Sequence, residues 1–267
     1  MTRRFLLLSL ASATAIFLAG CAAEPPAAPS EPPLHLYLLA GQSNMAGRGP
    51  VGDADSETHP RLLALKLDHG WGPASDPLHW DKPAIVGVGP GLAFGKAMAE
   101  RSPGVRIGLI PAAVGGSSIR VWVPGGVHEQ TNSRPWDDAV SRTFRVLALQ
   151  GGELKGVIWH QGESDAKDFS EQYGGALADL IERMRHEFEA PDLPFVAAKL
   201  SSFWVESRPG GKTINEAIAK LPETVPLTAY VSGEGFEHKG DDVHLDSASA
   251  RELGRRYAEA MSGLTAN

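Results

Sequence analysis

The amino-acid sequence predicts an α/β fold, a three-layer α/β/α sandwich in which a central, mostly parallel sheet of five strands lies between two layers of helices. Two observations support this prediction. Short β-prone runs alternate with longer segments of helical periodicity, and the β-prone runs are continuously apolar, as in strands buried on both faces. A chain of 267 residues with 42% hydrophobic and 21% charged positions can bury such a core in one domain.

The expected elements follow one another in a regular order. The five strands are expected over residues 34–40, 105–110, 154–160, 195–200 and 227–232. Helical patterns lie between and after them, over residues 91–101, 136–149, 170–188, 213–221 and 247–261. Right-handed crossovers between parallel strands would place these helices on both faces of the sheet.

One long interval, residues 45–90, departs from this order. It is rich in Gly, Pro, Asp and Trp and shows no clear period, so we expect a surface excursion. Two interpretations of Trp71, His79 and Trp80 in this interval are open. These side chains either form one wall of a substrate site or pack the excursion onto the body of the domain.

The N-terminus carries the pattern of an export signal. Arg3 and Arg4 precede an apolar stretch that is too short to span a membrane comfortably, and Gly20-Cys21 follows it. Leu18-Ala19-Gly20-Cys21 resembles the bacterial lipobox, so we expect a signal peptide over residues 1–20 and lipidation of Cys21. The protein is then expected to be exported and lipid-anchored to the bacterial cell envelope, at the outer membrane or the cell surface.

A Pro-rich segment separates this signal from the predicted domain. Residues 21–33 read as an extended linker, and the folded domain is expected over residues 34–264. Cys21 is the only cysteine, so the fold can contain no intramolecular disulfide.

The charge balance narrows the class of partner. The chain has 25 basic and 32 acidic side chains, a formal charge of -7. This balance disfavours nucleic acid and anionic membrane surfaces as electrostatic partners and fits a small neutral or polymeric substrate better.

Polar segments follow the predicted strands, where ligands bind in an open parallel sheet. They supply a serine, glycine-rich turns, an amide side chain and an Asp-x-x-His pair, which are the parts of a nucleophilic acyl-transfer site. Met45 stands where the α/β-hydrolase elbow Gly-x-Ser-x-Gly requires its second glycine, so that scaffold is excluded. The four segments are residues 41–47, 113–118, 160–165 and 238–244.

These segments resemble the sialate O-acetylesterase and acetylxylan esterase branch of the SGNH hydrolases, which is similar to carbohydrate esterase family 6. Lipase-like members of the superfamily carry Gly-Asp-Ser and Gly-x-Asn-Asp, whereas this chain has Gln42 and Gln161 at the corresponding positions. The resemblance implies a flavodoxin-like SGNH fold and a serine esterase that removes O-acetyl groups from carbohydrates without a cofactor or a metal. It rests on Gly41-Gln42-Ser43-Asn44-Met45, Gly115-Gly116, Trp159-His160-Gln161-Gly162-Glu163-Ser164-Asp165 and Asp241-x-x-His244.

The resemblance also implies a catalytic triad. It assigns Ser43 as nucleophile, His244 as general base and then general acid, and Asp241 as the group that orients the imidazole. The chemistry agrees, because a serine hydroxyl needs a neutral imidazole to take its proton, and a carboxylate on the other ring nitrogen fixes the tautomer. Since adjacent side chains diverge, we expect Asp242 to point away from His244.

The remaining site residues would surround the reacting carbonyl. The resemblance implies an oxyanion hole formed by the Ser43 N–H, the N–H of Gly116 or Gly115, and the side-chain amide of Gln161. Gln42, Gly115 and Glu163 would contact the substrate or support the catalytic groups, with no firmer role.

Two alternatives stay open at this point. One is metal-assisted deacetylation, although no His-Glu-x-x-His pattern supports it. The other is a non-catalytic lipoprotein that uses the same fold to bind glycans. Which sugar would carry the acetyl group, acetylated xylan, sialic acid or another glycan, is likewise open. The residues that suggest a metal site are His238, Asp241, Asp242, His244 and Asp246.

Overall fold

The structure is a computed structural model that describes residues 31–265. The predicted signal peptide, Cys21 and most of the linker therefore lie outside the described residues. None of the described helices is long and apolar enough to cross a membrane.

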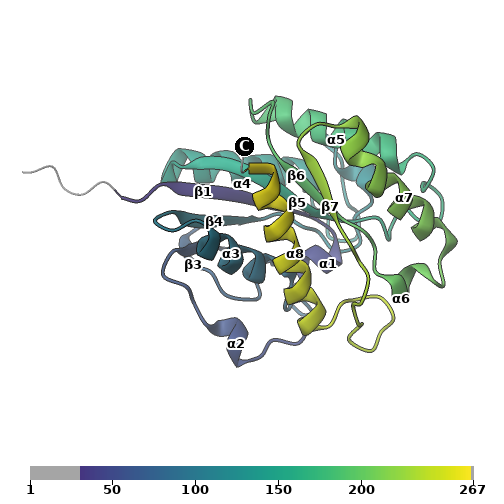
Figure 1. Cartoon of the computed structure of the whole chain (residues 1–267), viewed down its shortest axis with the longest axis horizontal. Coiled ribbons are helices and arrows are strands. Elements are labelled where there is room, and N and C mark those ends of the chain that lie inside the picture. Colours follow the sequence, from purple (N-terminus) through teal and green to yellow (C-terminus); the bar gives the residue numbers. More distant parts are fainter. Residues whose placement is uncertain (1–30, 266–267) are drawn as a thin grey trace, which may run out of the picture. The chain divides into compact units, whose positions relative to one another are not determined.

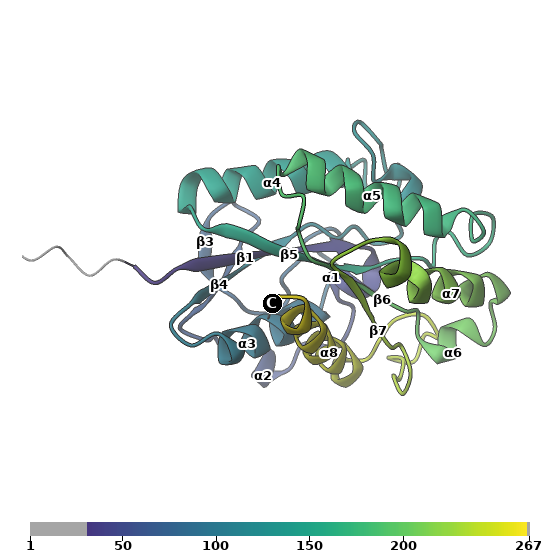
Figure 2. The same ribbon diagram turned by 45° about the horizontal axis from the view of Figure 1, so that its top comes forward.

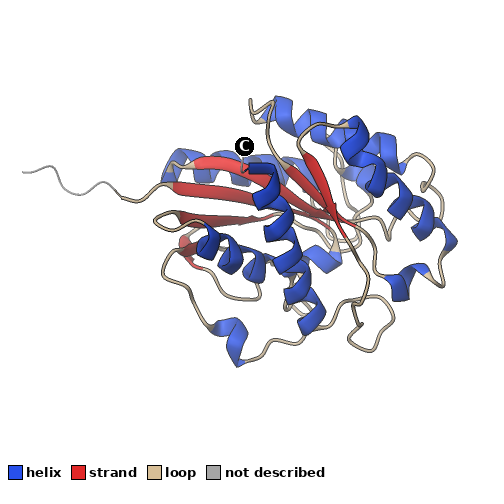
Figure 3. Cartoon of the chain, in the orientation of Figure 1, coloured by secondary structure: helices blue, strands red, loops and turns tan. Residues whose placement is uncertain are grey.

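A single seven-stranded sheet forms the centre of the domain, in the order β3-β2-β4-β1-β5-β6-β7 (Figures 1 and 3). Neighbouring strands are parallel except for the pair β2 and β3. The five predicted strands are all present and form the five-strand core of the sheet. They are β1 (Leu34–Gly41), β4 (Arg106–Pro111), β5 (Glu153–His160), β6 (Phe195–Ala198) and β7 (Thr228–Val231).

The predicted count of five strands is wrong by two, because the excursion over residues 45–90 contains two short strands. β2 (Leu62–Leu65) pairs parallel to β4, and β3 (Trp71–Pro73) pairs antiparallel to β2 at the edge of the sheet. Strands of four and three residues are too short for a periodic pattern to distinguish them from a loop.

The aromatic residues of the excursion fix it to the domain. His79 is buried, with its Nε2 3.5 Å from the Leu39 carbonyl oxygen. Trp80 lies under the Arg142 guanidinium, 4.8 Å from ring centroid to Cζ, and Trp71 packs against the core. Of the two readings of these side chains, the structure shows the packing role.

Helices cover both faces of the sheet, as predicted (Figure 2). On one face α3 (Pro90–Arg101) and α8 (Ser247–Thr265) pack against each other, and on the other face lie α4 (Pro135–Gln150), α5 (Tyr173–Glu187) and α7 (Pro209–Thr224). Four single-turn elements complete the description: α1 (Ser43–Ala46), α2 (Asp53–Ser56), the 3-10 turn η1 (Ile119–Val121) and α6 (Ser202–Val205).

The central strand shows why the core has two halves. Leu36 and Leu38 of β1 pack in the cluster under α4 and α5, whereas Tyr37 and Leu39 pack in the cluster under α3 and α8. Successive residues of a strand face opposite sides of a sheet, so an unbroken apolar run requires helices on both sides. The carboxyl ends of β1, β4 and β5 consequently meet at one edge, which the polar segments then occupy.

Candidate active site

Backbone hydrogen bonds bring three of the polar segments together at the carboxyl ends of β1, β4 and β5. The Gln42 N–H donates to the His160 carbonyl oxygen at 2.8 Å, and the Val114 N–H donates to the Gly41 carbonyl oxygen at 2.9 Å. The Ser164 hydroxyl donates to the carbonyl oxygen of Gly116 at 2.9 Å. The segments after these three strands therefore form one continuous site.

The turn that presents Ser43 depends on Gly41. This residue has φ +128°, and a Cβ built on it would lie 2.1 Å from the His160 carbonyl oxygen, so a side chain cannot be accommodated there. After Gln42 the chain begins α1, which follows β1 closely (Figure 1). Ser43, the first residue of α1, is largely buried. Because Ser43 is the first residue of a helical turn, its N–H has no acceptor within that turn.

The fourth segment contributes a hydrogen-bonded His–Asp pair. His244 Nδ1 lies 2.7 Å from Asp241 Oδ2, and Asp241 Oδ1 accepts the backbone N–H groups of Val243 at 3.0 Å and of His244 at 2.8 Å. Partial burial opposes ionisation of Asp241, but these hydrogen bonds and the nearby imidazole outweigh it and hold the pKa of Asp241 well below its usual range. The Asp241 carboxylate is therefore ionised and is held in place as a hydrogen-bond acceptor for Nδ1 of His244.

Asp242 points away from this pair, as expected. Its carboxylate lies 3.1 Å from His238 Nε2, and its side chain is 79% exposed. The acidic residues of the segment thus belong to two separate His–Asp pairs. Among residues 31–265, no group of three or more His, Cys, Asp or Glu side chains is arranged to hold a metal ion.

Asn44 joins the Ser43 turn to the segment that carries His244. Its Nδ2 donates to the Val243 carbonyl oxygen at 3.2 Å, and its Oδ1 accepts the Leu245 N–H at 3.0 Å. Within the described chain, neither Ser43 Oγ nor His244 Nε2 has a hydrogen-bond partner, so both groups are uncommitted. Hydrogen bonds between a nucleophile and its base commonly form only in the complex with substrate.

The prediction that Gln161 donates to the oxyanion does not fit this geometry and is corrected. The Gln161 side chain is fully buried, and its Nε2 already lies 2.6 Å from Asp165 Oδ2, 3.1 Å from Gln42 Oε1 and 3.1 Å from the Ser117 carbonyl oxygen. An amide nitrogen has two hydrogens, so these three acceptors leave none for a substrate. Gln161 instead orients Gln42 and the loop after β4.

Gln42, unlike Gln161, keeps its amide hydrogens free. Its Oε1 accepts hydrogen bonds from Gln161 Nε2 at 3.1 Å and from the Ser164 N–H at 3.3 Å, which fixes the orientation of the amide. Its Nε2 has no acceptor among the described residues. The amide of Gln42, beside Ser43, is therefore a free donor at the site.

The two glycines after β4, Gly115 and Gly116, differ in whether their N–H groups are hydrogen-bonded. The Gly115 N–H donates to Asp81 Oδ2 at 2.7 Å, and the same oxygen bonds to Arg48 at 2.6 Å. A Cβ on Gly115 would lie 2.2 Å from the Arg48 guanidinium, so a side chain there would displace the ion pair of Arg48 with Asp81. Burial opposes ionisation of Asp81, but Arg48 and Gly115 lower its pKa. The Gly116 N–H has no acceptor among residues 31–265 and remains available.

Glu163 is bonded to the Ser43 turn through Asn44 and makes no hydrogen bond to His244. Its Oε1 accepts Asn44 Nδ2 at 2.7 Å and lies 3.9 Å from His160 Nδ1. Complete burial lowers the pKa of His160, which favours its neutral form. Sequence reasoning missed Asn44, Arg48 and Asp81, and of these only Asn44 carried a signal, since it belongs to the motif around Ser43.

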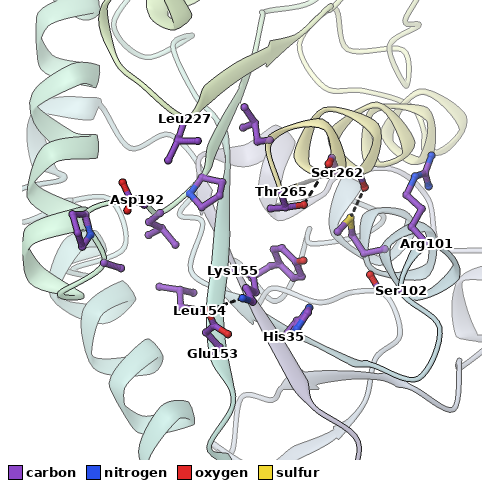
Figure 4. A pocket seen from close by; sticks show the side chains of 17 residues that line it. His35, Arg101, Ser102, Glu153, Leu154, Lys155, Asp192, Leu227, Ser262 and Thr265 are labelled. Carbon is purple, nitrogen blue, oxygen red and sulfur yellow. Dashed lines mark hydrogen bonds and ion pairs between the residues drawn. The ribbon is translucent and has the colours of Figure 1, made fainter. Parts of the chain in front are cut away.

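A separate cavity of about 900 Å³ lies at the other end of the strands, where β1 and β5 begin (Figure 4). His35 and the ion pair of Lys155 with Glu153 border it, together with Ser262 and Thr265 of α8. None of the predicted site residues lines this cavity. The candidate active site is therefore the edge at the carboxyl ends of the strands.

Comparisons with known proteins agree with the motif resemblance. The family model described as "Carbohydrate esterase, sialic acid-specific acetylesterase" matches residues 33–263. A protein of Arabidopsis thaliana named as a probable carbohydrate esterase is 33% identical over 250 residues, which cover 86% of this chain and 90% of that protein.

Solved structures give the same result for the fold. The X-ray structure of an Arabidopsis thaliana protein has a TM-score of 0.76 at 32% identity and covers 87% of this chain and 99% of its own. The crystal structure of NanS has a TM-score of 0.70 at 18% identity, covering 89% and 99% respectively, a likeness of fold. The chain therefore belongs to the sialic acid-specific acetylesterase family of carbohydrate esterases and is a carboxylic ester hydrolase.

Proposed function

We propose that the protein is a serine esterase that removes O-acetyl groups from carbohydrates through a triad of Ser43, His244 and Asp241. The observation that carries this proposal is the 2.7 Å contact between His244 Nδ1 and Asp241 Oδ2, on a segment that Asn44 bonds to the Ser43 turn. Within the described chain, this arrangement leaves Nε2 of the imidazole and the serine hydroxyl without a hydrogen-bond partner.

The reaction proceeds in two acyl-transfer steps. His244 Nε2 takes the proton of Ser43 Oγ as this oxygen attacks the acetyl carbonyl carbon, and His244 then gives that proton to the departing sugar oxygen. Water, deprotonated by the same imidazole, attacks the acetyl carbon on Ser43. Acetate leaves as the C–Oγ bond breaks, and the imidazolium returns its proton to Ser43 Oγ. Asp241 holds the imidazole in the productive tautomer and stabilises the imidazolium that forms in each step.

The oxyanion hole of this proposal consists of the Ser43 N–H, the Gly116 N–H and the Gln42 side-chain amide. All three donors lack an acceptor among the described residues, and the amide is fixed by Gln161 and Ser164. Donors that are oriented before the reaction stabilise developing charge without reorganisation.

A Gln42→Glu variant is expected to lower kcat for 4-nitrophenyl acetate by roughly 10²- to 10³-fold with little change in KM, the signature of a donor used mainly in the transition state. The variant keeps an oxygen to accept from Gln161 and the Ser164 N–H but has no amide hydrogens. Gln42→Ala, which introduces no charge, should show the same split in steady-state kinetics. A rise in KM at unchanged kcat would instead make Gln42 a substrate-binding residue.

The family supports the proposed class of substrate. Its description names sialic acid-specific acetylesterases, and the Arabidopsis thaliana relative is named as a carbohydrate esterase. We propose an O-acetylated sugar or glycan as substrate, with no nucleic acid partner. Acetylated xylan, O-acetyl sialic acid and a chromogenic acetate, compared side by side, would identify the sugar.

A serine-directed organophosphonate separates this proposal from metal-assisted deacetylation. It is expected to abolish activity with one equivalent bound, and mass spectrometry should locate the adduct on Ser43. A chelator should leave activity unchanged. Inactivation by the chelator without labelling by the phosphonate would overturn the proposal, and absence of activity towards every acetyl ester would favour a glycan-binding protein.

For the N-terminal region we propose the export and lipid anchoring that its sequence indicates. Two or more acyl chains on Cys21 would attach the protein stably to a membrane, since each buried methylene contributes ~0.8 kcal/mol. The proposal rests on the lipobox-like sequence alone, because Cys21 lies outside the described residues.

A further inference from the structure

We infer that Asn44 and Glu163 form a positioning pair that sets the place of His244 relative to Ser43. The inference rests on the proposed function, because it concerns the distance between the proposed base and the proposed nucleophile. Neither residue is expected to touch the substrate, and both would act through the backbone that carries the imidazole.

The first observation is how Asn44 holds the His244 segment. Its carboxamide bonds to the peptide groups on both sides of His244, through the Val243 carbonyl oxygen at 3.2 Å and the Leu245 N–H at 3.0 Å. Among the described residues, these are the hydrogen bonds that join residues 41–47 to residues 237–246. Since Asn44 is covalently next to Ser43, its side chain relates the base to the nucleophile directly.

The second observation is how Glu163 fixes the carboxamide. Asn44 Nδ2 donates to Glu163 Oε1 at 2.7 Å, shorter than either bond to the His244 segment. A carboxylate only accepts, so it selects the orientation in which the nitrogen faces Glu163 and Val243 and the oxygen faces Leu245. With the amide reversed, its oxygen would oppose the carboxylate and both bonds to the His244 segment would be lost.

The third observation is that Glu163 has few other contacts. Its side chain is 7% exposed, its Oε2 is buried without a partner, and the nearest basic group is His160 at 3.9 Å. A buried carboxylate that is this poorly satisfied destabilises the folded state. Its one short hydrogen bond goes to Asn44. We therefore assign Glu163 the role of orienting Asn44, which in turn holds the His244 segment.

A double-mutant cycle that exchanges the amide and the carboxylate between the two positions tests the pair. Asn44→Asp should lower kcat/KM for 4-nitrophenyl acetate about 100-fold, through kcat, because two facing carboxylates would displace the His244 segment by the order of 1 Å. Glu163→Gln should cost less than about 10-fold, since glutamine still offers an acceptor to Asn44. In the double variant the introduced glutamine can donate to the introduced aspartate, which removes the repulsion but does not restore the bond to the Val243 carbonyl oxygen. Activity should therefore recover about 10-fold over Asn44→Asp and stay below that of wild type.

Further readouts distinguish positioning from a general loss of structure. Thermal unfolding should show that all three variants fold, and the phosphonate should label Ser43 in each at rates that follow kcat. If Asn44→Asp does not fold, Asn44→Ala and Glu163→Ala replace it, and the loss in the double variant is then expected to equal the loss in Asn44→Ala alone. Additive losses without recovery, or losses confined to KM, would overturn the inference.

The same experiment keeps the two proposals apart. Wild-type protein and the Ser43→Ala variant are assayed in parallel with the cycle. Activity that persists in Ser43→Ala would overturn the proposed function, whereas Ser43-dependent activity with an additive Asn44 and Glu163 cycle would overturn the positioning pair alone.

Discussion

Replacing Ser43 with Ala is expected to lower kcat for acetyl ester hydrolysis by about 10⁴- to 10⁶-fold. Without Oγ no acetyl-enzyme forms, and the oxyanion donors and substrate binding alone supply only a small residual acceleration over water. The rate of 4-nitrophenol release from its acetate, measured at saturating substrate, gives the effect directly.

A matched serine variant makes this result specific. Ser232 Oγ accepts the exposed Glu234 N–H and makes no hydrogen bond to a proposed site residue, so Ser232→Ala should keep kcat and KM within a factor of about two of wild type. Both variants should keep the circular dichroism spectrum of the wild type. Activity retained in Ser43→Ala would show that another group attacks the ester and would end the triad proposal.

The second large effect concerns the two adjacent aspartates. Asp241→Asn should lower kcat on the order of 10⁴-fold, because asparagine in place of the carboxylate favours the wrong tautomer of His244. Asp242→Asn should change kcat far less, since its carboxylate is exposed and lies 3.1 Å from His238. Parallel assays on one acetyl ester, with folding checked by circular dichroism, rank the two. The reverse ranking would assign the orienting role to Asp242.

The same residue makes a prediction about pH. Hydrogen bonds hold the pKa of Asp241 well below its usual range, so the loss of activity on acidification should not come from protonation of this carboxylate. Because the folded-state pKa lies below the unfolded value of about 3.9, the pair stabilises the fold above that pH, and the stabilisation is lost as pH falls through the folded-state pKa. The difference in Tm between wild type and Asp241→Asn should therefore shrink in strongly acidic buffer.

The architecture could be predicted because the apolar runs are long enough to indicate strands that are buried on both faces. Residues 34–40, for example, alternate between the two halves of the core, and the pattern alone required helices on both faces. The start of α7 was missed because Pro209 and two glycines precede the periodic part. Glycine is needed there, since a Cβ on Gly210 would lie 1.7 Å from the Ala166 carbonyl oxygen. That contact is tertiary and leaves no local pattern.

The candidate site likewise has a part that the sequence predicts and a part that it does not. The resemblance to the esterase family, with which elementary chemistry agrees, selected Ser43, Asp241 and His244, and the structure brings their segments together. The roles of the two glutamines could not be predicted, because Gln42 and Gln161 carry the same functional group. Which one has free hydrogens depends on Asp165, whose buried carboxylate accepts from Gln161 at 2.6 Å. Such an assignment requires knowing every acceptor around each amide.

The position of β1 in the sheet also constrains the order in which the chain can fold. This strand, the first of the domain, lies between β4 and β5, so its two neighbours come from residues 106–111 and 153–160. Closing such distant pairings costs loop entropy before any contact compensates for it. The Ser43 turn, which hydrogen-bonds to His160, therefore cannot take its final shape until more than half of the chain is available.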